Sequence, residues 1–185
     1  MGTSVFLVGL PGSGKSTVGR QLARRLGLQF LDSDHVIEER LGCSIREYFD
    51  REGEAAFRDL EQATVDELSQ LPDTVLSTGG GTVLREANRQ VLHSRGWVVY
   101  LKSHPAELYR RLRHDKTRPL LQVGDPLQKL KDLYHVRDPL YREVAHHVLE
   151  TGRPTVTMLV NHIAMQLEQR ALQMPATQQE TPPAP

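Results

Sequence analysis

Short apolar runs alternate along this chain with longer segments in which apolar side chains recur at helical spacing. The short runs are rich in β-branched residues, and several end in glycine or a polar residue, which predicts buried strands. We expect five strands, the last of them weak, at residues 4–9, 29–31, 74–77, 98–101 and 147–149.

The segments between these strands have the spacing of amphipathic helices. In the helix predicted at residues 15–26, Val18, Leu22 and Leu26 lie on one face, and Gly27 ends it. Further helices are predicted around residues 36–41, as two or more segments within 42–71, and at about 85–94, 105–113, 126–144 and 154–170. Because strands and helices alternate, the sequence predicts an α/β fold with a mostly parallel sheet covered on both faces.

Two stretches lack this periodicity. Residues 114–126 (HDKTRPLLQVGDP) are polar and interrupted by glycine and proline, which predicts a long loop that acts as a mobile lid, at about residues 112–126. From about residue 171 the chain is rich in Pro, Gln and Thr, which predicts a disordered tail over 171–185. The remainder, residues 1–170, is long enough for a single domain with a sizeable core.

Composition narrows the class of protein. The 185 residues include 23 Lys and Arg against 23 Asp and Glu, a balance that argues against a nucleic-acid-binding protein. One cysteine, Cys43, can form neither an internal disulfide nor a cysteine-rich metal site. No stretch approaches the roughly 18 apolar residues of a membrane span, and the N-terminus does not resemble a signal peptide. We therefore expect a cytoplasmic protein without a membrane or nucleic-acid partner.

A glycine-rich loop follows the first predicted strand. Residues 9–16 (GLPGSGKS) fit the pattern G-x-x-x-x-G-K-[ST] between a strand and a helix, which predicts binding of the phosphates of ATP. Glycines allow the backbone N–H groups to approach the phosphates, the Lys15 ammonium can reach them, and the Ser16 hydroxyl can ligate Mg²⁺. The predicted nucleotide-binding residues of this loop are Gly12, Ser13, Gly14, Lys15, Ser16 and Thr17.

Two aspartates follow the second strand. Because Asp32 and Asp34 follow the carboxyl end of a parallel strand, as the phosphate loop does, we expect them at the same edge of the sheet. Ligands of parallel sheets bind at this edge. One carboxylate can hold Mg²⁺ and the other can accept a proton from an attacking hydroxyl; alternatively, Ser33 or Asp34 only caps the next helix. The third strand ends in Ser77 and Thr78 without an acid, so Asp32 is the nearest candidate for the metal.

A second glycine run, STGGG at residues 77–81, follows the third strand. Taken together with five other motifs in the same order, it resembles shikimate kinase: GLPGSGKST (9–17), DSD (32–34), SIREYFDREGEAAFRDLE (44–61), KTRPLL (116–121) and RDPLYREVA (137–145). The resemblance covers about residues 3–165. It implies a P-loop, nucleoside-monophosphate-kinase-like fold with a five-stranded parallel sheet flanked by helices, a substrate-binding helical segment at about 33–61 and a lid.

The resemblance also implies an activity and the residues that carry it. The family transfers the γ-phosphoryl group of ATP to the 3-hydroxyl of shikimate, a step towards chorismate and the aromatic amino acids, and is expected to be monomeric. The residues implied to bind shikimate are Asp34, Arg58, Gly79, Gly80, Gly81 and Arg137. Asp34 would also act as base or orienting group, and Arg58 would be held in place by Glu61, three residues later on the same helix.

On the ATP side, the resemblance gives a role to three further arginines. Arg118 would reach the phosphates from the lid and act with Lys15 in catalysis, and Arg111 would pack on adenine. Arg153 lies in the region of the adenine loop. The alternative for the basic residues of 110–118 is a solvated helix face.

Two other readings stay open at this point. One is another small-metabolite kinase of the same fold, for gluconate or a nucleoside monophosphate. The other is a non-catalytic module that senses ATP, although the catalytic and binding residues above are all present together, and a degenerate module is expected to have lost at least one.

Overall fold

The structure is a computed structural model that describes residues 2–114 and 124–173. Its strands are β1 (Val5–Val8), β2 (Gln29–Asp32), β3 (Thr74–Ser77), β4 (Trp97–Lys102) and β5 (His147–Glu150). Its helices are α1 (Lys15–Leu26), α2 (Ser33–Leu41), α3 (Ile45–Glu52), α4 (Glu54–Leu68), the 3-10 helix η1 (Thr82–Leu84), α5 (Glu86–Arg95), α6 (Pro105–Leu112), α7 (Pro126–Val144) and α8 (Val156–Gln173). The predicted strands and helices are confirmed within a few residues at each end.

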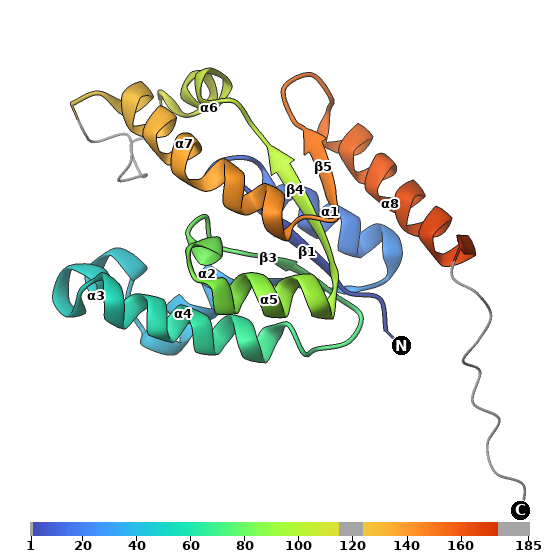
Figure 1. The fold of residues 1–185 in the computed structure, drawn as a ribbon, viewed down its shortest axis with the longest axis horizontal. Helices are drawn as coiled ribbons and strands as arrows, with labels where there is room; N and C mark the ends of the chain where they lie inside the picture. Colours follow the sequence, from blue (N-terminus) through green and yellow to red (C-terminus); the bar gives the residue numbers. More distant parts are fainter. Residues whose placement is uncertain (1, 115–123, 174–185) are drawn as a thin grey trace, which may run out of the picture.

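The five strands form one parallel sheet in the order β2-β3-β1-β4-β5. Helices cover both of its faces, with α1 and α8 on one side and α4, α5 and α7 on the other (Figure 1). The carboxyl ends of all five strands therefore meet at one edge, and the loops that leave them build the candidate site there. The predicted α/β class with a five-stranded parallel sheet is confirmed.

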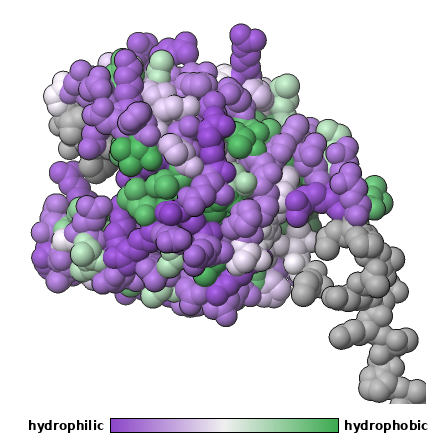
Figure 2. Space-filling view, in the orientation of Figure 1, coloured by the Kyte–Doolittle hydropathy of each residue, from purple (hydrophilic) through white to green (hydrophobic). Residues whose placement is uncertain are grey.

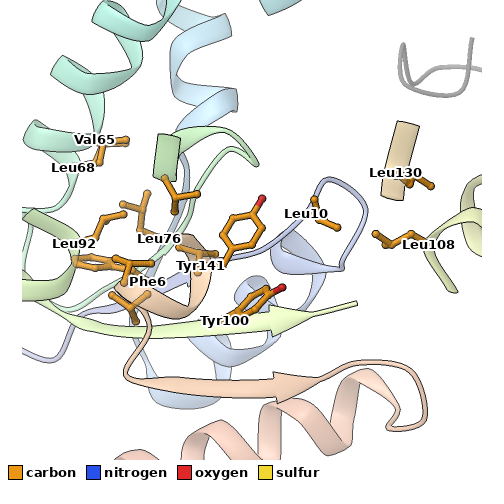
Figure 3. Close-up of a cluster of buried hydrophobic side chains, with 14 residues drawn as sticks. Phe6, Leu10, Val65, Leu68, Leu76, Leu92, Tyr100, Leu108, Leu130 and Tyr141 are labelled. Atoms are coloured by element: carbon orange, nitrogen blue, oxygen red, sulfur yellow. The ribbon is translucent and has the colours of Figure 1, made fainter. Parts of the chain in front are cut away.

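Alternation along β1 explains the two layers of the core. Val5 and Leu7 point towards α1 and α8, whereas Phe6 and Val8 point towards α5 and α7, and all four are fully buried. Figure 3 shows the core cluster that contains Phe6 and Val8. In this cluster the ring centroids of Tyr100 and Tyr141 are 4.9 Å apart. A strand buried on both faces has to be apolar at every position, which is the pattern that the sequence shows.

The ends of the helices near the site are set by capping residues. Gly27 adopts a left-handed conformation and stops α1, as predicted. The cap of α2 is Asp32, whose side chain accepts the N–H groups of Asp34 and His35. The expectation that Ser33 or Asp34 would be the capping residue is thus wrong, because both already have helical geometry inside α2.

The C-terminal boundary also differs from the prediction. Helix α8 continues through residues 171–173, which the sequence assigned to the tail. Ala171 and Leu172 are strong helix formers, and the helix has no reason to stop before the approach of Pro175. The rest of the predicted tail, and most of the predicted lid, lie outside the described residues. Within the described ranges, none of the helices is both long and apolar enough to cross a membrane.

Candidate active site

The loop between β1 and α1 has the backbone geometry of a phosphate cradle. Gly12 and Gly14 have φ angles of 82° and 94°, in the left-handed region that a residue with a Cβ seldom adopts. Lys15 is only 8% exposed, and its ammonium donates to the carbonyl oxygens of Gly9 and Leu10 at 2.8 and 2.9 Å. The loop thus holds the charge of Lys15 at the N-terminus of α1, where backbone N–H groups also favour an anion.

Ser16 and Asp32 meet beside this loop. The Ser16 hydroxyl donates to Asp32 Oδ2 at 2.6 Å, while Asp32 Oδ1 accepts the backbone N–H of Asp34 at 3.0 Å. One carboxylate oxygen of Asp32 therefore caps α2, and the other accepts the Ser16 hydroxyl beside the phosphate loop. Two hard oxygen donors on adjoining elements form a donor set that suits Mg²⁺, which takes one or two protein oxygens and completes its shell with phosphates and water.

A cleft of about 930 Å³ opens next to the phosphate loop. Figure 2 shows this face hollowed between α7 on one side and α3 and α4 on the other, with mostly hydrophilic surface around a few apolar side chains. The lining combines charged groups with two phenylalanines from α3 and α4. Its predicted members are Asp34, Arg58, Gly79, Gly80, Gly81 and Arg137. The structure therefore brings together all six residues that the sequence assigned to the substrate.

Asp34 has an unusual environment in this cleft. Its burial, followed by the nearby carboxylates of Glu61 and Asp32, raises the pKa of Asp34 to about 7, although Lys15 opposes the shift. A carboxyl group with that pKa exchanges its proton near neutral pH, as a general base in a hydroxyl group's reaction must.

Arg58 is held by a buried partner. Its Nη1 donates to Glu61 Oε1 at 2.9 Å, and the two side chains are 13% and 1% exposed. The second oxygen of Glu61 accepts the Thr82 hydroxyl at 3.0 Å, and the Thr82 carbonyl accepts the side chain of Asn88 at 2.9 Å. The predicted pair of Arg58 and Glu61 is confirmed, and the chain of hydrogen bonds behind it fixes the guanidinium towards the cleft.

The three glycines pack so closely against neighbouring side chains that an added Cβ would clash at each of them. A Cβ would lie 2.6 Å from Asp34 Oδ1 at Gly79, 2.7 Å from Pro11 Cδ at Gly80, and 2.5 Å from Arg58 Nη1 at Gly81. The backbone N–H of Gly79 is already hydrogen-bonded, because it donates to Ser33 Oγ at 3.2 Å. The N–H groups of Gly80 and Gly81 have no hydrogen-bond partner within the part of the chain that the structure describes.

The predicted adenine side is assembled in part. Arg111 on α6 donates to the Thr151 hydroxyl at 3.2 Å, which places it against the loop that follows β5. Arg153 lies exposed in the same loop, two residues after Thr151. Arg118, the predicted lid arginine, lies outside the described residues.

Two residues outside the predicted set contact the second glycine run. Pro11 covers Gly80, and the Tyr141 hydroxyl donates to the Gly80 carbonyl at 2.6 Å. Pro11 had a signal, because it stands inside the phosphate loop. Tyr141 had a weaker one: it lies four residues after Arg137, on the same face of α7.

Comparison with known proteins identifies the family of this chain. The family model described as "Shikimate kinase" matches residues 11–168. The shikimate kinase of Paracidovorax citrulli is 61% identical over 176 residues, which cover 94% of this chain and 96% of that protein. The shikimate kinase of Burkholderia pseudomallei is 58% identical over 165 residues, covering 89% and 90% of the two chains.

Solved structures agree with these relatives. The shikimate kinase from Acinetobacter baumannii in complex with shikimate superposes with a TM-score of 0.87 at 46% identity, covering 92% of this chain and 96% of that one. The shikimate kinase from Aquifex aeolicus gives a TM-score of 0.79 at 36% identity, with coverage of 92% and 99%. These structures share the P-loop, nucleoside-monophosphate-kinase-like fold that the motifs implied.

Proposed function

This chain belongs to the shikimate kinase family, and we propose from this premise that the cleft holds shikimate while the β1–α1 loop holds ATP. The enzyme phosphorylates the 3-hydroxyl of shikimate and releases ADP, a step towards chorismate and the aromatic amino acids. Among the acceptors that the motifs left open, the family selects shikimate over gluconate and nucleoside monophosphates.

The observation that carries the placement of shikimate is the buried ion pair of Arg58 and Glu61 at the wall of the cleft. Shikimate carries one carboxylate and three hydroxyls on a small ring. Arg58 and Arg137 supply planar forks for the carboxylate. The N–H groups of Gly80 and Gly81, which have no partner among the described residues, supply close donors. Glu61 neutralises Arg58 without occupying its whole fork, so the guanidinium keeps donors for the substrate.

Asp34 is proposed as the group that receives or orients the proton of the 3-hydroxyl. It lies in the wall of the same cleft, between the glycine run and the phosphate loop. Phosphoryl transfer depends mainly on alignment and on neutralisation of charge, so Asp34 contributes by aiming the hydroxyl oxygen as well as by accepting its proton.

Lys15 stabilises the charge on the transferring phosphoryl group, and the backbone N–H groups from Gly12 to Thr17 hold the phosphates. Arg118 adds a second positive charge from the lid, and Arg111 and Arg153 border the adenine. Ser16 and Asp32 would hold Mg²⁺, which neutralises phosphate charge when it is bound.

A monomeric state and a cytoplasmic location complete the proposal. The single cysteine among 185 residues suits a reducing compartment. Sedimentation at micromolar concentration tests the monomer directly.

A pair of matched substitutions tests the division of work between the two aspartates. Asp32→Asn keeps an oxygen for the cap of α2, so the helix should be preserved. Because the variant loses the charge of the carboxylate, it should need a higher Mg²⁺ concentration for half-maximal rate, and saturating Mg²⁺ should restore much of kcat. Asp34→Asn should lower kcat at every Mg²⁺ concentration. If both variants responded identically to Mg²⁺, the proposed roles would be wrong.

A further inference from the structure

Helix α7 contacts the second glycine run through two side chains that lie one turn apart. Arg137 Nη1 lies within 3.3 Å of the point where a Cβ on Gly80 would stand, and the Tyr141 hydroxyl donates to the Gly80 carbonyl at 2.6 Å. Residues four apart on a helix share a face, so the spacing in the sequence brings both side chains to the same glycine.

Contacts within the hydrophobic core hold the Tyr141 side chain in place. It is fully buried, and its ring packs on that of Tyr100, whose hydroxyl donates to Asp138 Oδ1 at 2.7 Å (Figure 3). Burial raises the pKa of Tyr141, against the opposing effect of the neighbouring Arg137 guanidinium, so its hydroxyl stays protonated and remains a donor. The hydroxyl position is therefore fixed by the core of the protein and does not depend on solvent.

The geometry of the peptide bond converts this contact into an orientation. In a trans peptide the carbonyl oxygen of one residue and the N–H of the next point in opposite directions. A carbonyl of Gly80 that is held by Tyr141 on the core side turns the N–H of Gly81 away from the core. Gly81 lies in the wall of the cleft beside Arg58, and its N–H has no partner within the described residues.

We propose that Tyr141 is a positioning residue that fixes the Gly80–Gly81 peptide so that its N–H donates to shikimate. The inference rests on the proposed function, in which shikimate lies against this glycine run. The carbonyls of Gly79 and Gly81 accept backbone N–H groups of η1, each at 3.1 Å. The Gly80 carbonyl between them is held by the Tyr141 hydroxyl instead. Tyr141 supplies that contact without touching the substrate.

The direct test is Tyr141→Phe, which removes one oxygen and keeps the ring. We expect the Kd and KM for shikimate to rise about tenfold, as for the loss of a buried hydrogen bond and the orientation it maintains, with the KM for ATP unchanged. Tyr100→Phe is the matched control: it removes a hydroxyl from the same cluster, but that hydroxyl donates to Asp138 and not to the glycine run. It should lower thermal stability while leaving the KM for shikimate unchanged.

A parallel shift of both KM values, or equal effects of the two phenylalanine variants on the KM for shikimate, would overturn the inference, because loss of packing alone then explains the result.

Gly81→Ala separates this failure from that of the proposed function. A Cβ on Gly81 would also displace the Arg58 guanidinium, which lies 2.5 Å from it. If Gly81→Ala weakens shikimate binding and Tyr141→Phe does not, shikimate lies against the wall formed by Arg58 and Gly81, and only the role of Tyr141 is wrong. If Gly81→Ala also has no effect, the placement of shikimate is wrong.

Discussion

Arg58 and Glu61 form an ion pair with one side in the cleft and the other in the core. The guanidinium lies 2.9 Å from a carboxylate that is only 1% exposed, and that carboxylate is bonded in turn to Thr82. Removal of one member of such a pair leaves the other as an uncompensated buried charge, which lowers the free energy of unfolding by roughly 3–5 kcal/mol. Replacement of Arg58 by alanine would thus disturb folding as well as binding.

Arg58→Lys avoids that difficulty because it keeps the positive charge beside Glu61. A lysine cannot offer a planar fork to the carboxylate of shikimate, so we expect the KM for shikimate to rise about tenfold or more while the KM for ATP stays near the wild-type value. Steady-state kinetics with each substrate varied in turn measures both. Arg40→Lys, at an exposed pair with Glu67 away from the cleft lining, serves as control. Wild-type kinetics for Arg58→Lys would mean that Arg58 does not bind the substrate through its fork.

Lys15→Ala tests the charge at the phosphate loop. The substitution removes a cation from the β1–α1 loop, and turnover should fall by about 10²–10³-fold, as for other groups that stabilise a developing charge. Circular dichroism should show an unchanged fold, because the Lys15 ammonium donates to two carbonyl oxygens of its own loop, at Gly9 and Leu10. A loss of less than tenfold in kcat would contradict a direct role in phosphoryl transfer.

The rate should depend on the protonation of Asp34. Because burial and neighbouring carboxylates raise the pKa of Asp34 to about 7, its ionised, proton-accepting form is lost as the pH falls below that value. We expect kcat/KM for shikimate to decline tenfold per unit at acidic pH, with a midpoint near 7 in the free enzyme. In Asp34→Asn this limb should disappear from the residual activity. An unchanged acidic limb in the variant would assign the titration to another group.

The same shift predicts a gain in stability for Asp34→Asn. The folded state binds the proton of Asp34 more tightly than the unfolded state, where the pKa is about 3.8. The stabilising effect of this proton is complete below pH 3.8 and lost as the pH rises through 7. Asparagine carries no charge, so the variant should exceed the wild type in free energy of unfolding by about 2–4 kcal/mol at pH 8.

Chemical denaturation of both proteins at several pH values measures this difference. The advantage of Asp34→Asn should shrink steadily as the pH falls towards 3.8, because Asp34 is already protonated in the folded state and takes up its proton in the unfolded state over this range. A constant difference across this range would show that the gain does not come from the charge of Asp34.

The local parts of this site could be predicted from the sequence. The phosphate loop follows from one continuous motif, and the pair of Arg58 and Glu61 follows from helical spacing. Contacts between distant segments could not be predicted in the same way. The bond from Tyr141 to Gly80 joins residues 61 positions apart, and it depends on how α7 packs across the sheet. Likewise, the Asp32 side chain divides its two oxygens between a cap and the phosphate loop, a detail set by atomic geometry.

The central claim is that this enzyme transfers phosphate from ATP to shikimate in the cleft beside the phosphate loop. The most direct measurement is the release of ADP from ATP and Mg²⁺ with shikimate, compared with quinate, gluconate and AMP as acceptors. The account predicts that ADP release rises with shikimate and stays at the background level with the other three. A rise with a different acceptor alone, or no rise with any of them in protein that binds ATP, would contradict it.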